Sequence, residues 1–138
     1  MSNAIGTALH DAFAGLVGGR VFPLLLGDRP TYPAIRYLIV SSRPDNTLLG
    51  QTNVTLWSYR IDVYAATAKE CAQICASVKS IMRRFAYRNT HQMEMEGYEP
   101  EARVCRRTLD FNISETEDPT VRVIATQPAQ RGPLQPQR

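Results

Sequence analysis

The sequence predicts an α+β fold, with one short and one long helix packed on a mainly antiparallel sheet of about four strands. Apolar residues recur at three- and four-residue steps in segments 3–16 and 67–85, which is the period of an amphipathic helix. Apolar residues recur at two-residue steps in segments 34–41, 55–64 and 103–115, which is the period of a strand. The 138 residues suffice for one domain with a substantial core.

The short helix is expected over residues 3–16, with Asn3 placed to cap its start. Its apolar stripe consists of Ile5, Ala8, Leu9, Ala12, Phe13 and Leu16. Gly18 and Gly19 end it, because glycine adopts the left-handed conformation that helix C-termini often need. Residues 20–33 contain three prolines and are expected to form an extended, partly buried connector.

A first strand is expected over residues 34–41, where apolar side chains on both faces indicate a well-covered strand. Residues 41–53 then predict a long, turn-rich loop whose turn lies at residues 44–46. The loop also carries Leu48 and Leu49. Two leucines on a loop either fold back onto their own domain or face a partner.

A second strand is expected over residues 55–64, with one strongly apolar face. That face holds Thr55, Trp57, Tyr59, Ile61 and Val63. Arg60 and Asp62 share the opposite face, about 7 Å apart along the strand. We interpret them as a solvated or subunit-facing pair rather than a catalytic one.

The long helix begins where the apolar period changes, at Thr67. Thr67 is the predicted N-cap, and Glu70 completes the capping-box pattern. The apolar stripe contains Cys71, Ile74, Cys75, Val78, Ile81, Met82 and Phe85. Two cysteines inside such a stripe are expected to be core residues, since a free thiol acts as a small hydrophobe.

Two further strands are expected near the C-terminus. His91 to Glu96 alternate as a short strand, Gly97 and Pro100 turn the chain, and the last strand runs over residues 103–115. Their short connection predicts an antiparallel hairpin. The Gln- and Pro-rich residues that follow are expected to be disordered or extended. The predicted organisation is therefore one domain over residues 1–118 and a tail over residues 119–138.

The residue patterns give little support for catalysis or metal binding. Cys71, Cys75, Cys105 and His91 could be combined into a zinc site, but the close cysteine pairs of zinc knuckles are missing. Neither histidine lies in a nucleophile motif, and no phosphate-binding glycine loop is present. We therefore expect no enzyme activity, no cofactor and no metal.

Charge and cysteine content limit the partners. The net charge of +3 is mildly basic, and no DNA-binding motif accompanies it. Arg83, Arg84 and Arg88 are explained by the negative end of the helix macrodipole, or by contact with a passing DNA backbone. No run approaches the roughly 20 apolar residues of a membrane helix. The three cysteines and the absence of a signal-peptide pattern predict free thiols in a reducing cytoplasm.

Four sequence segments occur in an order that resembles a known family. They are LVGGRVFP, YPAIRYLIVSSRPDNTLLG, WSYRIDVYAATAKECAQICASVKSIM and GYEPEARVCRRTLDFNIS. Together they resemble the tail-completion, or tail terminator, family of long-tailed bacteriophages and prophages over roughly residues 5–116. The segments are short and degenerate, and the specificity lies in their order and spacing.

The resemblance implies a structural virion protein with no catalytic residues. Such proteins form a hexameric ring at the head-proximal end of the tail tube, end tube polymerisation and offer a surface to the head connector. The implied partners are further copies, the tail tube protein, a head–tail connector or head-completion protein, and DNA passing without sequence-specific contact. The implied location is the head–tail interface of a virion assembled in the host cytoplasm. A head–tail joining or head-completion neck protein is the alternative, and a small enzyme or nucleic-acid-binding module is a third.

A ring of identical subunits needs two different contact patches on each copy. The candidates are a loop, a polar strand face, a hairpin tip and the C-terminal tail. In residues, these are Asp45, Asn46, Leu48, Leu49, Arg60, Asp62, Tyr98, Glu99, Pro100, Glu101, Pro128, Arg131, Pro133 and Leu134.

Overall fold

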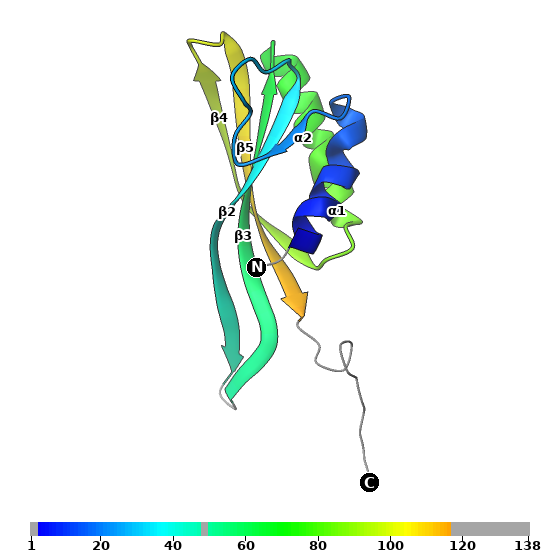
Figure 1. Ribbon diagram of the computed structural model, residues 1–138, viewed down its shortest axis with the longest axis vertical. Coiled ribbons are helices and arrows are strands. Elements are labelled where there is room, and N and C mark those ends of the chain that lie inside the picture. Colours follow the sequence, from blue (N-terminus) through cyan, green and yellow to red (C-terminus); the bar gives the residue numbers. More distant parts are fainter. Residues whose placement is uncertain (1–2, 48–49, 117–138) are drawn as a thin grey trace. The chain divides into compact units, whose positions relative to one another are not determined.

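The computed structural model describes residues 3–47 and 50–116 and has an α+β fold, as predicted (Figure 1). Its elements are α1 (Asn3–Phe13), η1 (Ala14–Leu16), β1 (Val21–Pro23), β2 (Ala34–Thr47), β3 (Gly50–Ala65), α2 (Ala68–Arg83), β4 (Asn89–Glu99) and β5 (Val104–Thr116). The five strands form one sheet in the order β1-β2-β3-β5-β4. The sheet is mixed because β1 pairs in parallel with β2.

The chain divides into two compact units. Of the described residues, the first unit consists of residues 3–42 and 57–114 and contains both helices and the core. The second contains residues 43–47, 50–56 and 115–116. Neither helix of the described residues is long and apolar enough to cross a membrane.

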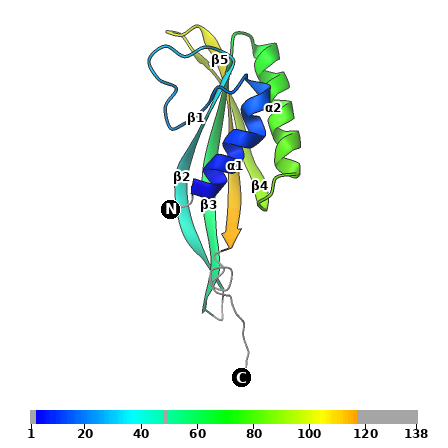
Figure 2. The ribbon, with the colours of Figure 1, turned by 45° about the vertical axis from the view of Figure 1, so that its right-hand side comes forward.

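Both helices pack on the same face of the sheet in the first unit (Figures 1 and 2). The core between them contains α1 residues Ile5, Leu9 and Phe13, sheet residues Tyr59, Ile61, Val63, Leu109, Phe111 and Ile113, and α2 residues Cys71, Cys75, Val78 and Met82. These residues occupy the positions that the helical and strand periods predicted. The apolar stripes therefore locate the core.

The ends of both helices follow the predicted local signals. The first helix is followed by Gly18 and Gly19, whose φ angles of 61° and 84° lie in the left-handed region. At α2, the Thr67 hydroxyl accepts a hydrogen bond from the backbone N–H of Glu70 at 3.1 Å. That contact satisfies one of the free donors at the helix start. Both predictions are confirmed.

The loop predicted over residues 41–53 is wrong. β2 continues to Thr47 and β3 begins at Gly50, so Asp45 and Asn46 belong to a strand. β1 pairs with β2 only as far as Tyr37. Beyond that point, among the described residues, β2 has β3 as its single neighbour, and a strand with one free side tolerates proline. The connecting Leu48 and Leu49 lie outside the described residues.

One other expectation about this part of the sheet needs correction. Ile39 and Val40 are 38% and 50% exposed, so the middle of β2 is not covered on both faces. The connector over residues 20–33 is extended and partly buried at its start, as predicted, and it contains one short strand, β1. Pro23 fits there because it is the last of the three β1 residues, where the missing N–H does little harm.

The C-terminal hairpin is antiparallel, as predicted. Its turn lies at residues 100–103, and Gly97 lies inside β4, opposite Arg106. Gly97 was predicted to be a turn residue, and its actual role is steric. A Cβ at this position would come within 2.6 Å of an Arg106 guanidinium nitrogen, so glycine lets that side chain lie across β4.

Candidate functional site

The sheet face opposite the helices carries a ladder of ion pairs in the first unit. Asp62 is 1% exposed and accepts hydrogen bonds from the Arg36 guanidinium on β2 and the Thr108 hydroxyl on β5. The Arg36 Nε lies 3.1 Å from the Asp62 carboxylate. Asp62 lies on β3, and its carboxylate binds one side chain from each neighbouring strand. It therefore links β2, β3 and β5.

Arg60 and Asp62 share a face of β3, as predicted, but they have different partners. Arg60 donates two hydrogen bonds to Asp110 on β5, at 2.9 and 3.0 Å. The hydrogen bond to Asp110 raises the pKa of Arg60 further above its ordinary value. The expectation of a solvated pair is wrong for Asp62, because the chain itself buries that carboxylate. A contact of either residue with another subunit stays a prediction.

A second set of ion pairs joins α2 to the β4–β5 hairpin. Glu94 on β4 accepts a hydrogen bond from Lys79 on α2 at 2.8 Å and another from Arg107 on β5 at 3.0 Å. Arg107 also lies 3.6 Å from the carboxylate of Glu96. Glu94 therefore lies between two cations, one from α2 and one from β5. The group is structural, because each of its charges has a protein partner.

Low pH is expected to weaken the ion pairs of Glu94 with Lys79 and Arg107. The hydrogen bond from Lys79, assisted by Arg107, holds the pKa of Glu94 below its ordinary value of 4.5. A carboxylate with a lowered pKa in the folded state stabilises the protein above the unfolded-state pKa, and that contribution disappears as pH falls through the folded-state pKa. We therefore expect Glu94→Gln to be less stable than wild type at pH 7. The difference should shrink steadily below pH ~4.5. Urea unfolding of both proteins at several pH values measures this, and a difference independent of pH would contradict it.

The hairpin tip consists of Tyr98, Glu99, Pro100 and Glu101. Tyr98 is 56% exposed, and Pro100 and Glu101 are exposed as well. Glu99 forms an ion pair with Arg106, whose guanidinium lies across Gly97. The tip therefore presents an aromatic ring, a proline and carboxylates on a backbone that the ion pair fixes.

The cysteines behave as core residues, as predicted. Cys71 and Cys75 are buried, and the Cys71 thiol lies 3.2 Å from the carbonyl oxygen of Val63. A hydrogen bond with Cys71, together with burial, raises the pKa of Cys75. Its thiol is therefore neutral at pH 7. The described residues contain no group of three or more His, Cys, Asp or Glu side chains that could hold a metal ion.

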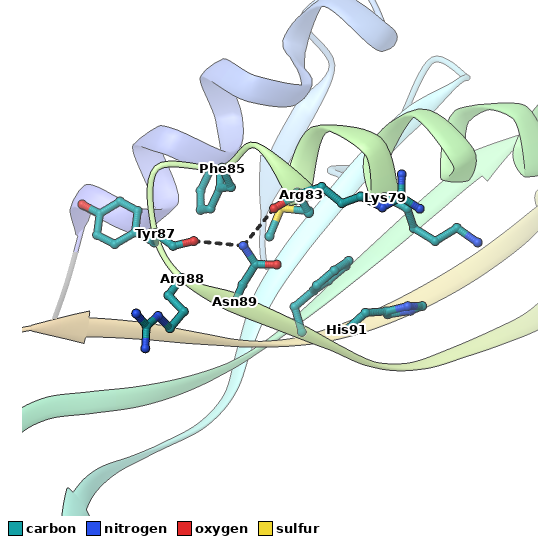
Figure 3. Close-up of a pocket in the computed structure, with 9 residues that line it drawn as sticks. Lys79, Arg83, Phe85, Tyr87, Arg88, Asn89 and His91 are labelled. Carbon is teal, nitrogen blue, oxygen red and sulfur yellow. Dashed lines mark hydrogen bonds between the residues drawn. The ribbon is translucent and has the colours of Figure 1, made fainter.

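A pocket of about 450 Å³ lies between the C-terminal end of α2 and the start of β4 (Figure 3). It is lined by Lys79, Met82, Arg83, Phe85, Tyr87, Arg88, Asn89, His91 and Phe111. The Asn89 side chain closes the connecting loop by donating to the carbonyl oxygens of Met82 at 3.0 Å and Tyr87 at 2.9 Å. The His91 ring stacks on Phe111 with a centroid distance of 4.9 Å.

Sequence reasoning missed this pocket. It had explained Arg83 and Arg88 by the helix macrodipole or by contact with a DNA backbone, and the structure shows that both line the pocket and are exposed. Within residues 3–47 and 50–116, neither arginine has an ion-pair partner. The helix end, the loop and the two strands that form the pocket are separate segments of the chain. The only hint of the pocket in the sequence is that cations lie close to two aromatic residues. No recognised motif marks it.

Two of the remaining sequence-predicted contact residues, Asp45 and Asn46, lie in β2 within the second unit. Pro128, Arg131, Pro133 and Leu134 lie outside the described residues, as do Leu48 and Leu49.

Comparison with known proteins identifies the family. Residues 3–115 match the family described as tail completion protein gp17, and this range extends from the start of α1 to the penultimate residue of β5. The chain belongs to this family. It is therefore a bacteriophage virion structural protein of the tail or neck, and the resemblance inferred from the sequence is confirmed.

A solved structure supports the fold. A chain from the "Virion of native gene transfer agent (GTA) particle" is 15% identical, with a TM-score of 0.56. The alignment covers 81% of this chain and 94% of that chain. At this identity the likeness shows a shared fold. No curated protein matches the sequence.

Proposed function

We propose that this tail completion protein is a tail terminator. Several copies form a ring, hexameric in our proposal, on the head-proximal end of the tail tube. The ring stops further addition of tube subunits and offers its outer surface to the head connector. The family match over residues 3–115 carries this proposal, because it includes all of the described helices and strands except the last residue of β5.

The described residues support an assembly role. The buried and half-buried carboxylates of Asp62 and Glu94 are bound by side chains of neighbouring elements, so they hold the fold together. Exposed apolar side chains occur on several elements, including Leu24 and Leu25 after β1 and Met95 on β4. Exposed apolar side chains beside polar ones are typical of surfaces that contact other proteins.

The proposed partners are further copies of the chain, the tail tube protein, and a connector or head-completion protein. DNA passes through the ring without sequence-specific contact, so its interaction is limited to the phosphate backbone. The proposed location is the head–tail interface of the virion, with assembly in the host cytoplasm. In this arrangement the Gln- and Pro-rich tail, with Pro128, Arg131, Pro133 and Leu134, binds a neighbour in an extended conformation.

Electron microscopy of particles made when the gene carries an early stop codon tests this function. We expect tails of excessive or scattered length, separated from full heads, because nothing ends tube growth. A plasmid copy of the wild-type gene should restore normal particles and serves as the control. Tails of uniform normal length beside empty or leaking heads would support a head-completion protein instead. Normal infectious particles would contradict both functions.

A further inference from the structure

The β4–β5 hairpin has two chemically different ends. The pocket of Figure 3 lies at the start of β4, and the tip of residues 98–101 lies at its other end. We propose that the tip of one copy docks in the pocket of the next copy. The proposal rests on the ring-forming function above and names the contact that joins neighbouring subunits.

The pocket suits an acidic and aromatic segment. Its lining includes Arg83 and Arg88, and it contains no aspartate or glutamate. Lys79 lines the pocket as well, but its charge is already bound to Glu94. The walls are aromatic, with Phe85 and Tyr87 at a centroid distance of 5.7 Å and the stack of His91 on Phe111. A volume of about 450 Å³ is in the range that holds a compact group of side chains.

The tip offers the complementary chemistry. Tyr98 is an exposed aromatic ring, a residue type enriched where proteins contact one another. Glu101 is exposed and, in the part of the chain that the structure describes, has no ion-pair partner. Arg103 closes the turn, so the tip residues 98–103 carry two carboxylates and one cation. The free carboxylate can meet the free guanidinium groups of the pocket, and the ring can pack against the aromatic walls.

The length of β4 determines which copy supplies the tip. β4 has 11 residues, which corresponds to roughly 36 Å from pocket to tip. The tip of a chain therefore cannot fill its own pocket. A contact between two different patches is heterologous, and such contacts repeat from copy to copy until a ring closes. The hairpin tip, together with the pocket that α2, the connecting loop and the start of β4 form, thus supplies both patches that a ring subunit needs.

Disulfide trapping on the full-length protein tests the contact. The variant with both Arg88→Cys and Glu101→Cys should give a ladder of dimers, trimers and larger species on non-reducing gels after mild oxidation. Each single variant should remain monomeric, because one patch does not meet itself. The control pair is Lys69→Cys with Glu101→Cys. Lys69 is exposed at the other end of α2, so this pair should give no ladder. Both purified protein and assembled particles are examined.

Charge exchange tests the chemistry. Arg88→Glu alone and Glu101→Arg alone should each lower the yield of infectious particles about tenfold or more, because like charges then face one another. The double variant should recover most of that loss. Arg84→Glu is the matched control, since Arg84 is exposed beside the pocket but does not line it. Thermal unfolding of each variant separates a lost contact from a lost fold.

Several results would overturn the contact. Assembled particles without a ladder would exclude it, and so would a ladder that stops at dimers, which indicates a two-fold contact. Cross-links from position 88 to a different protein would assign the pocket to another tail component. If the Arg88→Glu variant loses DNA retention and the cysteine pair gives no ladder, the pocket binds a DNA phosphate backbone instead. A ladder in purified protein together with normal particles from the stop-codon strain would keep the contact and remove the proposed function.

Discussion

Replacing Phe13 by alanine is expected to lower the free energy of unfolding by about 4 kcal/mol. Phe13 is the last residue of α1, it is fully buried, and it packs in the core with Leu9 and Ile5. Removing a buried phenyl ring loses its transfer free energy and leaves a cavity that the surrounding side chains fill incompletely. Urea unfolding followed by circular dichroism measures the change.

The size of this effect follows from how α1 is stabilised. An isolated helix of 11 residues is marginal in water, so α1 depends on its packing against the sheet. Thr7→Ala on the exposed side of α1 provides the control and should change stability by less than about 0.5 kcal/mol. A loss below about 1 kcal/mol for Phe13→Ala would contradict the packing of α1 described here.

The elements with strong local signals could be predicted from the sequence. The stripe of α2, its cap at Thr67 and the alternation of β5 each fix which face is buried, because the apolar period and the backbone geometry have to agree. The same reasoning placed Cys71 and Cys75 in the core. These features depend on residues that are near in sequence.

β2 could not be predicted in full because strand pairing overrides its local sequence signal. Its second half contains Pro44, Asp45 and Asn46, which have low strand propensity and favour turns. Pairing with β3, which begins at Gly50, overrides that preference, since the neighbouring strand supplies hydrogen bonds. Local propensity is a weak guide wherever pairing with another strand decides the structure.

Of the two proposed contact surfaces, the sequence predicted the hairpin tip but not the pocket. Tyr98 to Glu101 were recognised as an exposed tip, because glutamate and proline at a hairpin end indicate a surface position. The pocket was missed because its lining comes from a helix end, a loop and two strands. The turn prediction for Gly97 was also wrong. Glycine is needed there because a side chain would collide with Arg106 on the neighbouring strand.

Asp62→Ala is expected to lower the free energy of unfolding by about 3 kcal/mol. The variant leaves the Arg36 guanidinium and the Thr108 hydroxyl without their shared acceptor, and the place of Asp62 is buried. Losing one member of a buried ion pair is costly because the remaining charge stays desolvated. Arg36 is 27% exposed, so water relieves part of the cost and keeps the loss at the lower end of the range for buried pairs.

Asp110→Ala is the matched control. Asp110 forms a bidentate pair with Arg60 on the same sheet face, but that arginine is 36% exposed and regains water when its partner is removed. Surface pairs contribute little, so we expect a loss of about 1 kcal/mol or less. Equal losses for the two variants would show that burial of Asp62 adds nothing to its pairing. A larger loss for Asp62→Ala, partly recovered in Asp62→Asn because the amide oxygen can still accept from Thr108, would establish Asp62 as the junction of β2, β3 and β5.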